Sequence, residues 1–88
     1  MVIKILGTGC AKCKNLDRKV RELVEKQNIN AEVLYVTDIN EMIEAGIMMT
    51  PGLSVNGVVK SIGIIPKEEQ LLKWFTEWKL WIILHYSF

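Results

Sequence analysis

Cysteine, proline and histidine are scarce in this sequence, whose 88 residues include two cysteines, two prolines and one histidine. Small secreted domains without a large core are held together by many disulfides, so two cysteines exclude a scaffold of that kind. Neither sign of charge dominates, because eleven basic and ten acidic residues leave a net charge of +1. We expect no nucleic-acid partner, since such a partner requires a strongly basic surface. The two cysteines are therefore expected to perform chemistry.

Long apolar runs are also absent. The longest uncharged run, 45–59, has fifteen residues and the C-terminal run, 80–88, has nine, whereas a membrane-spanning helix needs roughly 18 or more. The first apolar stretch is interrupted at Lys4 and is shorter than the roughly 7 to 15 residues of a signal-peptide core. We therefore expect no membrane span and a location in the reducing cytoplasm. With 50% hydrophobic residues, the chain is rich enough in apolar side chains for one folded domain, and too short for two.

The first third of the sequence alternates between strand and helix patterns. Residues 2–6 are short, mostly apolar and β-branched, and stop at Gly7, which is typical of a buried strand. Between Ala11 and Asn28, apolar side chains recur on one helical face and charged ones fill the other; the apolar positions are Leu16, Val20, Leu23 and Val24. Residues 31–36 predict a second strand.

A short helix and a hairpin are expected next. Asp38 and Glu41 have the spacing of a capping box and predict a helix over 39–45 that Gly46 closes. Asn56–Gly57 separates two apolar runs and predicts a type I′ turn, because both turn positions require positive φ.

A final helix is expected to start at Pro66, whose fixed φ suits the first helical position and which is followed by acidic side chains. Its predicted buried stripe consists of Leu71, Phe75, Trp78 and Ile82. The predicted order is thus β-α-β-α-β-β-α. Two parallel strands, a hairpin and three helices make a small α/β fold.

Cys10 and Cys13 lie between the first predicted strand and the first predicted helix. A helix N-terminus stabilises a thiolate through its unpaired N–H groups and its dipole, so we predict that Cys10 is the nucleophile, with a pKa below that of a free thiol. Cys13 lies one helical turn further on, within reach of a mixed disulfide at Cys10. Lys12 and Lys14 add positive charge that favours the thiolate.

Two other interpretations of the Cys-x-x-Cys pair stay open from the residues alone. The thiols could be an incidental buried pair, since free cysteine is among the most buried residue types. They could also bind Cu(I), Zn or an iron-sulfur cluster. Two thiolates do not complete a tetrahedral site, and the one histidine, His85, lies far along the chain. Small metal carriers also run β-α-β-β-α-β, which conflicts with the predicted helix over 39–45.

Thr50 and Pro51 precede the first strand of the predicted hairpin. On residues alone, Pro51 is an ordinary strand-opening proline, because only about 5 to 6% of X–Pro bonds in folded proteins are cis.

Strand, Cys10-x-x-Cys13, helix, strand, short helix, Thr50-Pro51, hairpin and final helix together resemble the thioredoxin superfamily over about residues 1–78. The approach through Gly7 to Gly9 and the placement of Gly63 after the hairpin resemble most the small thioredoxin-like or glutaredoxin-like redox-active disulfide proteins of archaea and bacteria.

The resemblance implies a thioredoxin-like fold, with a four-stranded mixed sheet and helices on both faces. It implies a thiol–disulfide oxidoreductase that acts on protein disulfides, is renewed by a thiol reductase and uses no cofactor beyond the redox-active disulfide Cys10–Cys13. It further implies that the Pro51 bond is cis beside the cysteines and that Thr50 offers backbone groups to an extended substrate. The predicted substrate-binding residues are Thr50, Pro51, Gly9, Lys12 and Gly63.

Three departures from the family pattern leave the redox potential and the use of glutathione open. The dipeptide between the cysteines is Ala11-Lys12, unlike the Gly-Pro of thioredoxins or the Pro-Tyr of glutaredoxins. Lys4 stands where thioredoxins carry a buried carboxylate, six residues before the first cysteine. Gly63 is followed by Ile64 rather than by the second glycine and acidic residue of glutaredoxins.

The last residues extend the apolar pattern beyond what one helix face can bury. We expect a domain over 1–79 and an apolar tail over 80–88, in which apolar side chains point in every direction. A contiguous exposed apolar patch marks an interface more often than it remains exposed, so we predict that the tail mediates a homodimer. The alternative is a tail that folds back onto its own domain.

Overall fold

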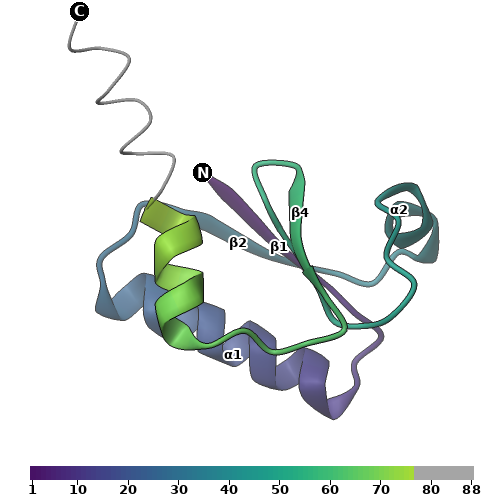
Figure 1. Ribbon diagram of the computed structural model, residues 1–88, viewed down its shortest axis with the longest axis horizontal. Helices are drawn as coiled ribbons and strands as arrows, with labels where there is room; N and C mark the ends of the chain where they lie inside the picture. Colours follow the sequence, from purple (N-terminus) through teal and green to yellow (C-terminus); the bar gives the residue numbers. More distant parts are fainter. Residues whose placement is uncertain (77–88) are drawn as a thin grey trace, which may run out of the picture.

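The computed structural model describes residues 1–76, and residues 77–88 lie outside the described part. Along the chain come β1 (Val2–Leu6), α1 (Ala11–Lys26), β2 (Glu32–Val36), α2 (Ile39–Glu44), β3 (Gly52–Val55) and β4 (Val58–Ile62) (Figure 1). Residues 68–76 are helical and form the final described helix. The predicted order of elements is confirmed this far along the chain. The predicted boundary after residue 79 and the tail 80–88 lie outside the described residues.

The four strands form one mixed sheet in the order β2-β1-β3-β4. β1 pairs in parallel with β2, and antiparallel with β3, which pairs antiparallel with β4. This confirms the predicted pair of parallel strands followed by a hairpin. The arrangement places the carboxyl end of β1 in the middle of the sheet, where the chain turns into α1.

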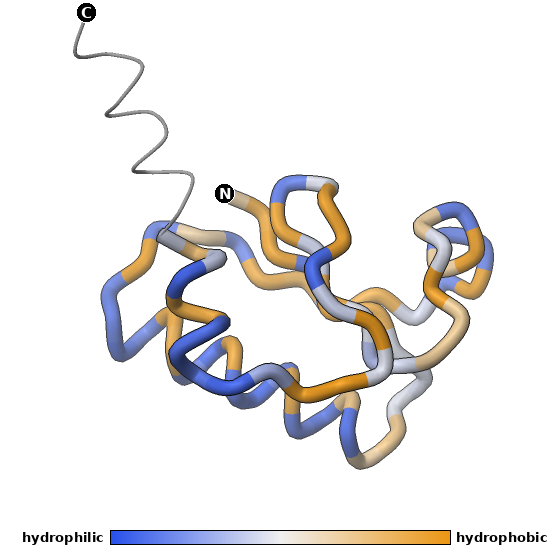
Figure 2. The backbone as a smooth tube through the Cα atoms, viewed as in Figure 1, coloured by the Kyte–Doolittle hydropathy of each residue, from blue (hydrophilic) through white to orange (hydrophobic). Residues whose placement is uncertain are grey.

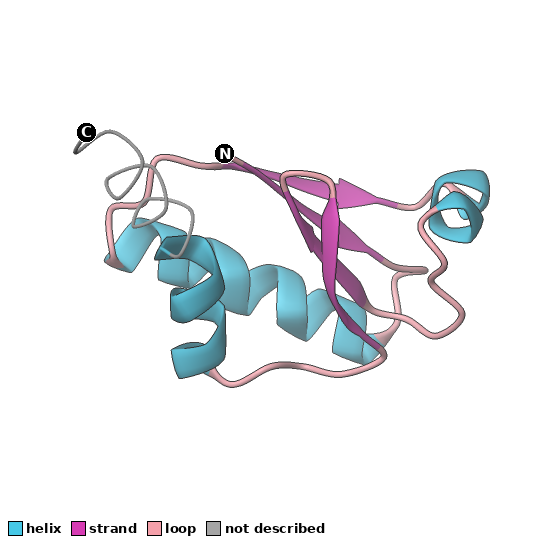
Figure 3. Ribbon diagram, turned by 45° about the horizontal axis from the view of Figure 1, so that its top comes forward, coloured by secondary structure: helices cyan, strands magenta, loops and turns pink. Residues whose placement is uncertain are grey.

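Helices cover both faces of the sheet, as predicted, but unequally (Figure 3). Ile3 and Ile5 of β1 are fully buried in a cluster with side chains of α1 and of the final described helix. Side chains alternate along a strand, so Lys4 and Leu6 face the other side. There Leu6 packs against Met42 of α2, and Lys4 binds Glu41. α1 and 68–76 thus form one layer, and α2 covers only one end of the opposite face.

α1 is amphipathic, as its sequence pattern predicts, and apolar and hydrophilic residues alternate along its tube (Figure 2). It ends at Lys26, two residues earlier than the side-chain pattern indicated. Asn28 has a left-handed backbone with φ of 51°, and the N–H of Ile29 reaches back to the carbonyl of Val24. Asparagine tolerates this conformation at the end of a helix. The spacing of apolar side chains does not indicate where the backbone adopts this left-handed conformation and ends the helix.

The hairpin has the predicted turn, with φ of 51° at Asn56 and 84° at Gly57. The side chain of Asn56 also accepts a hydrogen bond from the N–H of Val2 at 2.9 Å. This bond ties the turn to the start of the central strand. A bulge between Leu53 and Ser54 shifts the register of β3 against β4, which alternation alone did not predict.

Two predicted helix starts need correction. Asp38 caps α2, but it accepts from the N–H of Asn40, and Glu41 binds Lys4 instead of completing a capping box. Pro66 precedes the final described helix instead of occupying its first position. The carbonyl of Lys67 accepts the first helical bond, from the N–H of Leu71 at 3.0 Å, which makes Lys67 the capping residue.

No helix within residues 1–76 has the length and apolarity that crossing a membrane requires.

Candidate active site

Cys10 and Cys13 form a disulfide at the start of α1, with their Cα atoms 5.0 Å apart. Cys10 is the capping residue of this helix, with an extended backbone of φ −66° and ψ 165°. The carbonyl of Cys10 accepts the first helical bond from the N–H of Lys14. The first turn contains no acidic residue, so no carboxylate there neutralises the positive end of the helix dipole.

The two sulfur-bearing side chains differ sharply in exposure. Cys13 is fully buried, with 0% of its surface exposed, whereas Cys10 is partly exposed. The N–H of Cys13 donates to the Sγ of Cys10 at 3.2 Å. A backbone donor is therefore already directed at the more accessible sulfur, as an N-cap interaction requires.

Thr50 and Pro51 lie directly beside this disulfide. The hydroxyl of Thr50 is 3.8 Å from the Sγ of Cys10, and because a disulfide sulfur carries no proton, the hydroxyl is the donor. The Thr50–Pro51 bond is cis, which confirms the expectation drawn from the family resemblance. The N–H of Gly63 donates to the carbonyl of Pro51 at 2.8 Å, so Gly63 joins the same loop cluster.

The other two predicted site residues, Gly9 and Lys12, lie in different surroundings. Gly9 lies in the loop just before Cys10, with φ of 87°, a conformation that favours glycine. Lys12 is exposed in the first turn of α1. Its ammonium group makes no hydrogen bond or ion pair with the rest of residues 1–76.

Two residues beside the cysteines, Gly7 and Tyr35, were not predicted to be part of the site. A Cβ atom on Gly7 would lie 2.6 Å from the Sγ of Cys13 and 3.1 Å from the hydroxyl of Tyr35. That hydroxyl accepts a hydrogen bond from the N–H of Gly9 at 2.9 Å. Tyr35 lies near the end of β2, in a run that predicted only a strand. The usable signal was that parallel strands bring their carboxyl ends to one edge of a sheet, so this part of β2 had to lie beside the Cys-x-x-Cys loop.

Lys4, six residues before Cys10, does not enter this cluster. Its ammonium group pairs with Glu41 at 2.7 Å on the face of the sheet that α2 covers. Both side chains are a little over one third exposed. The alternation of β1 sends Lys4 to the face opposite Ile3 and Ile5, against which α1 packs.

Exposed apolar side chains border the Thr50–Pro51 loop. Met48 is 90% exposed and Met49 65% exposed, and Ile64, next to Gly63, is 55% exposed. Met42, by contrast, is 5% exposed and lies in the core. Methionine adapts readily to different apolar partners, so this rim is suited to apolar segments of varied shape.

No group of three or more His, Cys, Asp or Glu side chains lies together anywhere in residues 1–76. The two sulfurs of the Cys-x-x-Cys pair are bonded to each other. The presence of α2 also departs from the β-α-β-β-α-β order of small metal carriers. The arrangement of the site thus favours disulfide chemistry.

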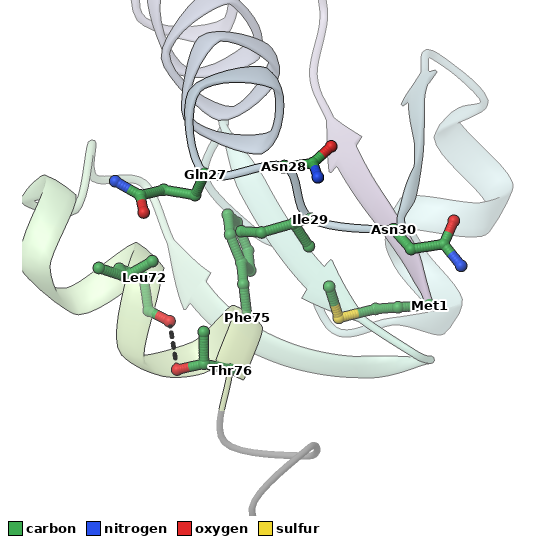
Figure 4. A pocket seen from close by; sticks show the side chains of 8 residues that line it. All are labelled: Met1, Gln27, Asn28, Ile29, Asn30, Leu72, Phe75 and Thr76. Carbon is green, nitrogen blue, oxygen red and sulfur yellow. Dashed lines mark hydrogen bonds between the residues drawn. The ribbon is translucent and has the colours of Figure 1, made fainter.

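A cavity of about 360 Å³ lies at the opposite end of the domain, beside the start of β1 and the end of α1 (Figure 4). Its lining contains no cysteine and no acidic or basic side chain; the residues are Met1, Gln27, Asn28, Ile29, Asn30, Leu72, Phe75 and Thr76. The cavity is therefore separate from the disulfide site.

Comparisons with known proteins agree with this geometry. The family model described as "Thioredoxin domain" matches residues 1–76. A thioredoxin of Methanothermobacter thermautotrophicus is 38% identical over 73 residues, which cover 83% of this chain and 95% of that protein. A thioredoxin of Methanocaldococcus jannaschii is 41% identical over 71 residues, which cover 81% of each protein.

Proposed function

The chain belongs to the thioredoxin family and is a thiol–disulfide oxidoreductase, and from that premise we propose that Cys10 attacks the substrate disulfide and Cys13 resolves the mixed disulfide. The observation that carries this assignment is the contrast in exposure: Cys13 is fully buried, whereas Cys10 is partly exposed. A substrate disulfide can approach the sulfur of Cys10 from solvent. The buried sulfur of Cys13 can instead attack the mixed disulfide that forms at Cys10.

Stabilisation of the Cys10 thiolate supports the same assignment. Its Sγ receives the N–H of Cys13 at 3.2 Å and faces the hydroxyl of Thr50 at 3.8 Å. Hydrogen bonds to an ionised acceptor are stronger than those to a neutral one, so both donors favour the charged form of Cys10. The dipole of α1 acts in the same direction.

The proposed reaction balances as two displacements. The Cys10 thiolate attacks one substrate sulfur; a mixed disulfide forms, the substrate S–S bond breaks, and the released sulfur leaves with the electron pair and takes a proton from solvent. The Cys13 thiolate then attacks the Sγ of Cys10, and the second substrate sulfur leaves in the same way. The substrate gains two electrons and the protein becomes the Cys10–Cys13 disulfide, the state in this structure. A thiol reductase returns two electrons to it, and no other cofactor takes part.

We assign substrate contact to Thr50, Pro51, Gly63, Gly9 and Lys12. Neither the N–H nor the carbonyl of Thr50 enters a backbone hydrogen bond within the described residues, which leaves both groups able to pair with an extended substrate. Met48, Met49 and Ile64 border this position with exposed apolar surface. The substrate segment we expect is therefore an extended and partly apolar stretch of protein around a disulfide.

A trapping experiment tests the two roles. With Cys13→Ser, the mixed disulfide cannot be resolved, so a protein disulfide substrate remains bonded to Cys10. The matched variant Cys10→Ser keeps one cysteine of the same motif but is expected to trap nothing. Efficient trapping on Cys10→Ser, detected as a band that a reducing agent removes, would reverse the assignment.

We further propose that the chain forms a homodimer through residues 80–88, which lie outside the described residues. Thr76, the last described residue, lines the cavity of about 360 Å³ in Figure 4. Ile29 packs there against the core cluster that contains Phe75, so the cavity has an apolar side. Twelve residues follow Thr76, long enough for the apolar tail of one copy to reach this cavity in another. We place the chain in the cytoplasm, where disulfides are typically transient and catalytic.

A further inference from the structure

Tyr35 holds the loop that carries the cysteines. Its hydroxyl oxygen accepts the N–H of Gly9 at 2.9 Å, and the N–H of Gly7 donates to the carbonyl of the next strand residue, Val36, at 3.0 Å. A tyrosine hydroxyl both donates and accepts. Because the bond to Gly9 uses it as an acceptor, its own proton remains available for a second partner.

In the disulfide form the sulfur of Cys13 lies near this hydroxyl but forms no hydrogen bond with it. The Sγ of Cys13 and the Oη of Tyr35 lie 2.6 and 3.1 Å, respectively, from one point, the position that a Cβ atom on Gly7 would occupy. The absence of a side chain at Gly7 therefore brings the buried sulfur and the hydroxyl to the same small space. Within residues 1–76, no hydrogen bond is formed in which this hydroxyl donates.

We propose that, in the reduced protein, the hydroxyl of Tyr35 donates a hydrogen bond to the sulfur of Cys13 and stabilises it as the resolving thiolate. The inference rests on the proposed roles of Cys10 and Cys13. It identifies Tyr35 as a residue that favours the second displacement, in which the thiol proton of Cys13 leaves to solvent before its sulfur attacks Cys10. A buried thiolate without such a donor is costly, because burial disfavours the charged form.

Charged groups near this space are few. Lys14 and Asp17 of α1 line a hollow with Tyr35 and Gly9, and Asp17 is bound to Arg21 at 2.9 Å. Lys4 and Glu41 pair with each other on the other face of the sheet. Asp17 is thus the acidic group whose influence has to be separated from that of the tyrosine hydroxyl.

Tyr35→Phe tests the proposal, since it keeps the ring and removes only the hydroxyl. The reduced full chain is mixed with an aryl disulfide, dithiobis(nitrobenzoate), which releases a coloured thiolate at each step. The first release is bimolecular and reports the attack of Cys10; the second is first-order and reports resolution by Cys13. Both rates are followed across pH in the native protein, in Tyr35→Phe and in Asp17→Asn, which keeps the hydroxyl and removes the neighbouring charge. Thermal unfolding checks that each variant is folded.

We expect the first-order release in Tyr35→Phe to be about tenfold slower at pH 7, because a hydrogen bond to a charged group typically contributes at least that factor. Its pH midpoint should move upward, so that the difference narrows at alkaline pH. The bimolecular phase should stay within about twofold of the native rate, and Asp17→Asn should leave the midpoint nearly unchanged.

Two results would overturn the inference: an unchanged first-order phase in Tyr35→Phe, or one slowed equally at every pH, as expected if the hydroxyl only holds Gly9. A failure of the proposed roles has a different signature. The native protein would then lack the order of a fast bimolecular step at Cys10 followed by intramolecular resolution.

Discussion

The backbone N–H of Cys13 donates to the Sγ of Cys10 across 3.2 Å. Cys13, whose side chain α1 buries, thus stabilises the sulfur of Cys10 through its backbone N–H. Because Cys10 caps α1 and Cys13 lies within its first turn, the spacing of the motif fixes this relationship. The two thiols are therefore chemically different before any substrate arrives.

Gly7→Ala should destabilise the protein by about 1 to 3 kcal/mol, the usual cost of overpacking a core. The new Cβ atom would lie 2.6 Å from the Sγ of Cys13 and 2.8 Å from its Cβ, so one of them has to move. Chemical denaturation of the oxidised protein measures the free energy of unfolding. Thr8→Ala, at the exposed neighbouring position, is the control and should stay within about 0.5 kcal/mol of the native value. Equal stabilities of the two variants would contradict the close approach.

Thr50→Val should slow the attack of Cys10 by roughly two- to fivefold at neutral pH, because it removes a weak hydroxyl donor and keeps the branched shape. The hydroxyl is 3.8 Å from the Sγ of Cys10. Without it the pKa of Cys10 rises, so the loss should diminish as pH increases. The bimolecular rate with an aryl disulfide measures the effect, and Thr37→Val, at an exposed position after β2, serves as its control. Identical slowing of the attack by both variants would show that the Thr50 hydroxyl has no specific effect on Cys10.

Glu41→Gln should change stability by less than about 1 kcal/mol, because solvent screens the pair that Glu41 forms with Lys4, whose side chains are both more than one third exposed. We also expect an unchanged rate of exchange, since the pair lies on the face of the sheet opposite α1. Denaturation and aryl-disulfide kinetics test both statements. A several-fold change in the resolving rate would show that this pair acts on Cys13.

Removal of the residues after Lys79 should convert a dimer into a monomer, because it deletes the apolar tail 80–88. Light scattering on the full and shortened chains gives the two masses, and circular dichroism checks that the shortened chain is folded. Two monomeric masses would defeat the proposed self-association. Two dimeric masses would place the interface elsewhere.

Much of this site could be predicted from the sequence because its signals are local. A strand that stops at Gly7 and an amphipathic helix from Ala11 are enough to place Cys10 at a helix start. The turn at Asn56–Gly57 follows from the positive φ that both positions require. The cis conformation of the Thr50–Pro51 bond was predicted from the family resemblance and not from the residues alone.

Contacts between distant segments were not predictable in the same way. The hydroxyl of Tyr35 meets Gly9 across 26 positions of the sequence, a contact that depends on the register of β1 against β2. Glu41 has the spacing of a capping box, yet it binds Lys4 because the sheet brings the ammonium group within 2.7 Å. In both cases a tertiary partner decides what a locally ambiguous side chain does.

Alkylation of the reduced protein at mildly acidic pH tests most directly the claim that Cys10 is the nucleophile. At such a pH only a thiol with a lowered pKa is appreciably ionised, and Cys10, which is partly exposed and caps α1, should react first. Mass spectrometry of peptides after partial reaction with iodoacetamide identifies the modified cysteine. We expect the label on Cys10 with Cys13 unmodified. Faster labelling of Cys13, or equal labelling of both thiols, would contradict the account.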